Sequence, residues 1–248
     1  MIIVFKLIIS KIEIWIANTI NMLNKIRKIG LLAISSIVCL FLSSCFDVVE
    51  EIDMKSNGSG SIVGTLNMSK SRTKVSSLMK LDKIDGFKIP NQAEIRKEVA
   101  TIVQLLKNTK GISNVDYRLD FNNYIASISC DFQNVQALNS YTETLSKHFK
   151  TKLNSYSSYS FNPSNKTFVR NYKYSTEAKK EFDKLKPENQ KSFDQAFYTS
   201  IYRFQNPVIK QDNTSGKVSG NKQAVMVKVS VPSLINGKAN LSNNIVLK

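Results

Sequence analysis

The feature that most constrains this fold is a strict two-residue alternation of apolar side chains in paired stretches. In the first stretch, Val48, Glu50, Ile52 and Met54 alternate with Val49, Glu51, Asp53 and Lys55. A second pair spans 115–132. Because successive side chains of a strand point to opposite faces, this period predicts strands with one face buried and one wet. Asn57-Gly58-Ser59-Gly60 and Asn122-Asn123 are turn signals, so we expect hairpins over 46–68 and 115–132.

Helical patterns separate these hairpins. Asn91 can cap a helix over 91–110, and Glu94 follows three residues later, as in a capping box. The apolar stripe of this helix would be Ile95, Val99, Ile102, Val103 and Leu106. Softer patterns predict further helices over 69–84, 134–149 and 176–197, the last interrupted at Pro187.

The remainder of the chain returns to strand patterns. A third hairpin is expected over 151–174, strands are expected over 198–204, 223–231 and 244–247, and a loop over 210–222. This order predicts an α+β fold, a mostly antiparallel sheet built from hairpins with interleaved helices packed on one face. We expect residues 45–248 to form a single domain, with a possible sub-boundary near 150–155.

The N-terminal region has the layout of a signal peptide. Lys25, Arg27 and Lys28 supply a positive segment, and the fourteen residues from Ile29 to Leu42 are mostly apolar. That length matches a signal sequence and is short for a membrane-spanning helix, which is the alternative. We therefore expect residues 1–44 to be removed as a leader.

The end of this leader, Leu42-Ser43-Ser44-Cys45, resembles the lipobox of bacterial lipoproteins. The resemblance implies cleavage between Ser44 and Cys45 and acylation of Cys45. Two or more acyl chains anchor a protein stably where one chain binds reversibly. It also implies a cell-envelope location on the outer or the cytoplasmic membrane, with the domain outside the cytoplasm.

A second apolar segment, Met1–Ile20, precedes this leader and is interrupted by Lys6, Lys11 and Glu13. A lipoprotein leader does not need it. We expect Met22 to be the functional start, and the alternative is an unusually long positive segment.

The opening of the mature part resembles LppM-type lipoprotein domains. Cys45 runs into a strand, the turn Asn57-Gly58 and a second strand that reaches Leu66, and a similar cadence returns from Tyr202 to Val208. This resemblance implies an envelope α+β domain with lipid or glycolipid binding. The family supplies no catalytic residues to transfer.

The chain is basic, with a formal charge of +16. The leader holds five of the basic residues and one acid, so the part from Cys45 onward keeps +12. Ten basic residues lie in 69–111 against four acids. This stretch is the candidate contact for anionic lipid or an envelope polymer, and its alternative is a solvated lysine-rich surface.

Residues that carry chemistry are sparse and lack the spacing of known motifs. Cys130 lies in an alternating apolar stretch, which favours a buried thiol over a nucleophile, and His148 is the single histidine, near a helix end. Asp116, Asp120 and Asp131 fall in strand positions where solvated charge is expected. Gly58, Gly60 and Gly64 are explained by a hairpin and not by a phosphate loop. We therefore expect no enzyme activity, metal, cofactor or nucleic acid.

Three functions remain from the sequence. The first is a non-catalytic envelope lipoprotein that binds a lipid or another amphiphile. The second is a structural or assembly subunit that docks on a membrane protein complex. The third is a hydrolase with an unrecognised site. An apolar cavity between sheet and helices would favour the first, a flat apolar patch the second, and a cleft with clustered titratable groups the third.

Overall fold

The computed structural model describes residues 46–149, 157–174 and 176–248. The predicted leader with Met22, the cleavage position Ser44 and the acylation site Cys45 lie outside these residues. The sub-boundary expected near 150–155 also lies outside them. The described residues all belong to one compact unit by their contacts.

Strands and short helices alternate along both halves of the chain. The first half holds β1 (Asp47–Met54), β2 (Gly60–Asn67), the 3₁₀ turn η1 (Ser69–Ser71), α2 (Arg72–Leu78), β3 (Lys83–Ile84), β4 (Phe87–Lys88), α3 (Gln92–Lys107), β5 (Ile112–Asp120), β6 (Ile125–Phe132) and α4 (Val135–His148). The second half holds β7 (Ser157–Asn162), β8 (Thr167–Tyr172), α5 (Thr176–Asp183), α6 (Pro187–Gln190), η2 (Lys191–Phe193), β9 (Phe197–Phe204), β10 (Val208–Gln211), β11 (Gly216–Val218), β12 (Ala224–Ser230), α7 (Val231–Ile235) and β13 (Asn243–Leu247).

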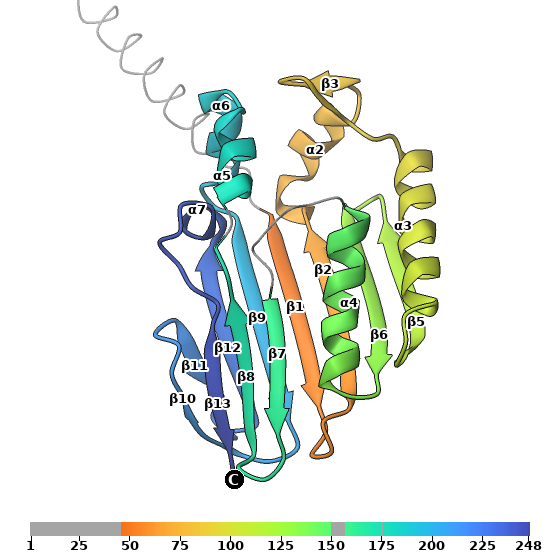
Figure 1. The fold of residues 1–248 in the computed structure, drawn as a ribbon. Coiled ribbons are helices and arrows are strands. Elements are labelled where there is room, and N and C mark those ends of the chain that lie inside the picture. Colours follow the sequence, from red (N-terminus) through yellow and green to blue (C-terminus); the bar gives the residue numbers. More distant parts are fainter. Residues whose placement is uncertain (1–45, 150–156, 175) are drawn as a thin grey trace, which may run out of the picture. The chain divides into compact units, whose positions relative to one another are not determined.

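Two sheets and the helices form the layers of this α+β fold, which confirms the predicted class (Figure 1). The large sheet has seven strands in the order β11-β12-β9-β1-β2-β6-β5. The small sheet has four strands in the order β10-β13-β8-β7. All pairs within these two sheets are antiparallel except β1–β9, which is parallel from Asp47↔Phe197 to Met54↔Phe204.

One face of the large sheet is buried. Helices α3 and α4 cover its β2–β6–β5 half, and the small sheet covers its β1–β9–β12 half (Figure 1). Phe168 of the small sheet packs on Tyr202 and Phe204 of β9, with ring centroids 5.5 and 5.7 Å apart. The core therefore lies between the sheets and continues under α3 and α4, where Leu106 and Leu138 are fully buried.

The edge of β7 is closed by a side chain of α4. Asn139 Nδ2 donates to the Tyr159 carbonyl at 2.8 Å, and the Tyr159 amide donates to Asn139 Oδ1 at 2.7 Å. The amide side chain thus replaces a neighbouring strand at this residue, which satisfies backbone groups that would otherwise be buried without partners.

Most predicted elements are confirmed at the level of type and place. The three hairpins are β1–β2, β5–β6 and β7–β8. The helix over 91–110 is α3, and its capping box between Asn91 and Glu94 is present with both hydrogen bonds at 3.0 Å. The helix over 134–149 is α4, and strands β9, β12 and β13 match the expected final strands.

Three predictions were wrong in extent. The helix expected over 69–84 ends at Leu78, because Lys83–Ile84 pairs with Phe87–Lys88 around the turn Asp85-Gly86, whose residues both have positive φ. The helix over 176–197 is interrupted before Pro187 as predicted, but its second part ends at Phe193, and Phe197 joins β9 instead. The loop over 210–222 contains β11, which pairs with β12 and extends the large sheet.

Candidate functional site

A cavity of about 500 Å³ lies between the buried face of the large sheet, the small sheet and the helices. Its walls come from β1, β2, β9, α4, α5 and α7, from Ser157 of β7, and from Arg170 and Tyr172 of β8. Its volume falls in the range of small-molecule sites, roughly 300–1,000 Å³. The apolar members of the wall are Phe46, Val48, Val49, Ile62, Leu145, Ala178, Val231, Leu234, Ile235 and Leu241.

The burial of successive β1 residues shows which end of the cavity is closed. Ile52 and Met54 are buried below it, where the two sheets meet directly, whereas Phe46 and Val48 are only half-buried. Leu145 of α4 is also half-buried, as is Leu234 of α7. The cavity is therefore closed toward the middle of the sheet and opens toward the end at which β1 begins.

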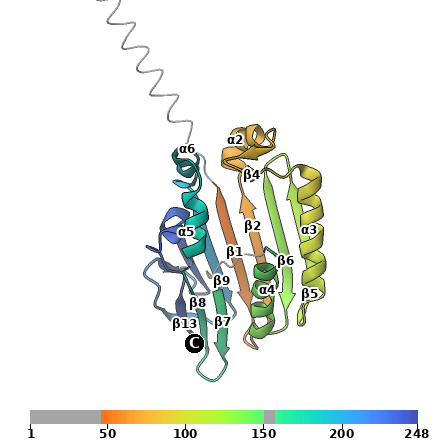
Figure 2. The same ribbon diagram turned by 45° about the horizontal axis from the view of Figure 1, so that its top comes forward.

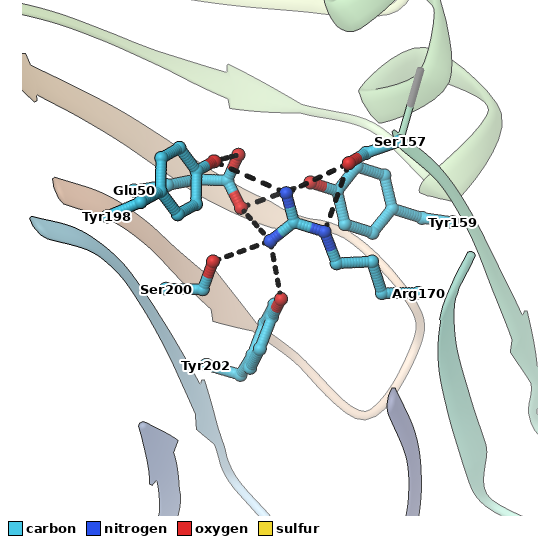
Figure 3. Close-up of polar contacts among 7 residues, drawn as sticks. All are labelled: Glu50, Ser157, Tyr159, Arg170, Tyr198, Ser200 and Tyr202. Atoms are coloured by element: carbon cyan, nitrogen blue, oxygen red, sulfur yellow. Dashed lines mark hydrogen bonds and ion pairs between the residues drawn. The ribbon is translucent and has the colours of Figure 1, made fainter. Parts of the chain in front are cut away.

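A buried ion pair forms part of the polar lining of the cavity wall (Figure 3). Arg170 extends from β8 across the space between the sheets, and its Nη1 lies 2.9 Å from Glu50 Oε1 on β1. The Arg170 side chain is 2% exposed and that of Glu50 is 15% exposed. The pair thus bridges the two sheets in an environment with little water.

Every nitrogen of the Arg170 guanidinium has an acceptor. Nε and Nη2 donate to Ser157 Oγ, and Nη2 also donates to Tyr198 Oη. Nη1 donates to Ser200 Oγ and Tyr202 Oη as well as to Glu50. A guanidinium has five N–H groups, so these contacts use its donors within the protein and leave none for a ligand.

The carboxylate of Glu50 is equally well satisfied. Tyr159 Oη donates to Oε1 at 3.1 Å and Tyr198 Oη donates to Oε2 at 3.0 Å. Desolvation opposes the charge on Arg170, but the carboxylate and the surrounding phenols outweigh it, so the pKa of Arg170 is raised. A buried pair that is fully hydrogen-bonded in this way orients both sheets.

Burial raises the pKa of the tyrosines around the cavity. Desolvation is the largest cause for Tyr141, Tyr159, Tyr198 and Tyr202, and Arg170 partly opposes it in the last three. These phenols therefore stay protonated and act as neutral hydrogen-bonding groups. The cavity offers a neutral, mostly apolar interior whose charges are already neutralised, which suits a hydrocarbon chain.

Cys130 and His148 have separate surroundings in the structure. Cys130 is 2% exposed, and burial raises its pKa to about 12, so its thiol is protonated. His148 Nε2 lies instead against α3, 2.8 Å from Glu98 Oε1. Neither residue lines the cavity.

The three strand aspartates do not form a cluster. Asp131 accepts a hydrogen bond from Asn114, whereas Asp120 accepts from the turn residues that follow it, Asn122 and Asn123. Asp116 is exposed on β5. Their contacts are local, as expected for charges on the wet face of a sheet.

The basic stretch 69–111 is spread over η1, α2, β3, β4 and α3. Lys70 pairs with Asp47 at 3.1 Å, Lys88 pairs with Glu94, and Arg96 lies over the Phe121 ring. Several of its charges are therefore engaged locally. Its members do not line the cavity.

Sequence reasoning missed the role of Arg170 and Glu50. A signal existed for Glu50, because it occupies an inward position of the alternating pattern between Val48 and Ile52. Arg170 likewise alternates with Phe168 and Tyr172 in β8. A single charge at an inward position of each of two strands indicates a buried pair, since a lone buried charge is too costly.

The described part of the chain lacks two features. None of its helices combines the length and apolar composition needed to cross a membrane. Within the same residues, no group of three or more His, Cys, Asp or Glu side chains could hold a metal ion.

Comparisons with known proteins give one structural likeness. No protein-family profile and no curated protein matches the chain. The structure is similar to the NMR structure of the folded domain of LppM from Mycobacterium tuberculosis, with 10% identity and a TM-score of 0.43 over 83% of this chain and 91% of that one. A likeness at this level assigns neither a family nor a function.

We expect Arg170→Met to lower the free energy of unfolding by about 3–5 kcal/mol, because it leaves the Glu50 carboxylate desolvated without its cation. Glu50→Gln should also destabilise the fold, since it leaves the Arg170 charge buried. The double variant should cost clearly less than the sum of the two single variants, as urea unfolding of all four proteins can measure. Strictly additive costs would contradict the coupling.

The raised tyrosine pKa values predict loss of stability in alkali. Folded phenols keep their protons above the unfolded pKa of about 10, so their contribution is complete below that pH and is lost as pH rises further. Urea midpoints measured between about pH 8 and about pH 11.5 should fall steeply at the upper end. Tyr141→Phe should make this fall shallower, whereas Tyr117→Phe, at a position 46% exposed, should leave it unchanged.

Proposed function

We propose that this chain is a lipid-anchored envelope lipoprotein whose α+β domain holds the apolar chain of an amphiphile in the cavity beneath α4, α5 and α7. The single observation that carries the proposal is the combination of apolar walls with an internally neutralised ion pair. Because Arg170 and Glu50 have no spare donor or charge, the closed end favours hydrocarbon. The polar group of the ligand would remain at the open end.

A glycine in the cavity wall supports the proposal that the space holds a ligand. Gly64 of β2 lies in this wall opposite Glu50, and an added Cβ there would meet only Tyr141 Oη, at 3.6 Å. Glycine inside a strand costs stability and often marks the close approach of a ligand. Its presence at this point leaves room that another residue would fill.

The other two functions receive less support. A docking subunit would use the outward face of the large sheet, where Arg203 instead pairs with Glu51 and with Asp53. A hydrolase would need an accessible nucleophile and base, and Cys130 is buried with a protonated thiol. His148 is engaged with Glu98.

Filling the cavity should weaken binding of a fluorescent fatty acid. We expect Gly64→Val to reduce the affinity for cis-parinaric acid about tenfold, because the new methyl groups displace roughly two methylenes worth about 0.8 kcal/mol each. Gly64→Ala should have a smaller effect in the same direction. Fluorescence titration of the folded variants measures both.

Gly220→Val is the matched control, because a Cβ at Gly220 meets nothing within 4 Å and Gly220 does not line the cavity. This variant should bind the fatty acid like the parent chain. Binding that is equal in all variants, or absent in the parent, would refute the proposed site.

The anchor is tested separately. Expression with radiolabelled palmitate in a bacterium that processes lipoproteins should label the chain and place it in the membrane fraction. Cys45→Ser should abolish the label and release the domain, whereas Cys130→Ala, which removes the buried thiol, should keep both. Label retained in Cys45→Ser would rule out acylation at this residue.

A further inference from the structure

The end of the domain at which β1 begins, which we call the entry end, gathers several short elements (Figure 2). Phe46 packs edge-on against Phe193 of η2, with ring centroids 5.4 Å apart, and Asp47 pairs with Lys70 of η1. Lys74 of α2 hydrogen-bonds Ser192 of η2. The described chain begins at this end with Phe46, the residue that follows Cys45 in the sequence.

Residues 72–88, which we call the α2–β4 lobe, project at the entry end and are held in place. The hairpin turn Asp85-Gly86 reaches α6, where the Lys186 amide donates to Asp85 Oδ2 at 2.9 Å and Asn189 Nδ2 donates to the same oxygen at 2.7 Å. These hydrogen bonds lower the pKa of Asp85, so its carboxylate is ionised and engaged. The lobe is thus a fixed surface and not a free arm.

Large apolar side chains of this lobe are exposed beside lysines. Leu81 is 49% exposed and Phe87 is 38% exposed. Lys80, Lys83 and Lys88 flank them in the sequence. The whole lobe carries five basic residues and two acids, one of which is the engaged Asp85. Exposed apolar side chains with lysines next to them in the sequence are typical of surfaces that lie in a membrane interface.

We propose that the α2–β4 lobe is a membrane-contact surface for anionic phospholipid. Leu81 and Phe87 enter the interface, and Lys80 and Lys83 lie at the level of the phosphate groups, whereas Lys88 is paired with Glu94. Two observations select a bilayer as the partner: the net positive charge of the lobe, and its place at the end from which the chain leads to the expected acyl anchor.

This contact would also set the orientation of the cavity relative to the membrane. Phe46 belongs both to the entry end and to the cavity wall, and the cavity opens toward the same end. A domain seated on its α2–β4 lobe would turn that opening toward the lipid, so an apolar chain could pass from the bilayer without crossing water. This step rests on the proposed function, whereas the contact itself does not.

The experiment uses the full-length chain, processed in its bacterial host, purified and reconstituted into vesicles. Leu81→Cys and Phe87→Cys are labelled with a thiol-reactive bimane, and lipids with a spin label on the acyl chain act as quenchers. Ile209→Cys is the matched control, since Ile209 is 66% exposed on β10, next to the chain end at Lys248. Cys130 stays unlabelled because its thiol is buried and protonated, and the parent chain gives the background.

We expect labels at 81 and 87 to be quenched several-fold more than the label at 209 in vesicles of phosphatidylcholine mixed with phosphatidylglycerol. Lys80→Glu/Lys83→Glu should reduce that quenching, and added salt should reduce it too. Equal quenching at 81, 87 and 209 would overturn the proposal. It would also be overturned if quenching changed neither in Lys80→Glu/Lys83→Glu nor with the anionic lipid content of the vesicles.

A parallel titration with cis-parinaric acid in detergent separates the two proposals. Lys80→Glu/Lys83→Glu should bind this probe like the parent chain, because neither lysine lines the cavity. Loss of selective quenching with probe binding intact refutes the membrane contact alone. Selective quenching without probe binding refutes the cavity function and leaves the membrane contact supported.

Discussion

The ion pair between Arg170 and Glu50 is the interaction on which the two sheets depend for their relative placement. Each partner comes from a different sheet, and each would be costly to bury alone. Apolar packing would tolerate some sliding of one sheet over the other, whereas this pair and its hydroxyl partners fix one alignment. Because both residues also line the cavity, the same pair fixes the position of two of its wall elements, β1 and β8. The hydroxyl partners come from β7 and β9: Ser157, Tyr159, Tyr198, Ser200 and Tyr202.

The local part of this fold could be predicted from the sequence. Alternation and turn residues locate β1–β2, β5–β6 and β7–β8, and the capping box at Asn91 locates the start of α3. These features depend on residues a few positions apart. The division into two sheets, the parallel β1–β9 pair and the pairing of β8 with β13 depend on contacts between distant segments. Periodicity says which face of a strand is buried but not which strand lies beside it.

The sequence carried two direct signals for the site, the inward charges of Glu50 and Arg170. Each charge indicates a buried partner, but nothing near either residue in the sequence shows that the two, 120 residues apart, pair with each other. The cavity arises from residues on many elements and from the small side chain of Gly64, and no spacing rule encodes it. The basic stretch 69–111 was recognisable as a group. Only the folded structure shows which of its basic residues pair with nearby acids and which belong to the α2–β4 lobe.

The large sheet can be completed only when its parallel strands β1 and β9 are both present. Strand β1 is made first, yet its neighbour β9 begins at Phe197, 150 residues later in the register. Until β9 exists, β1 has one unpaired edge, and the hydroxyl groups that complete the ion pair are missing. Such long-range pairing slows folding and makes it depend on most of the chain being present. The β1–β9 pair at the centre of the large sheet therefore forms only after most of the chain has been made. This order is compatible with the proposed export, in which a chain crosses a membrane unfolded and folds afterwards.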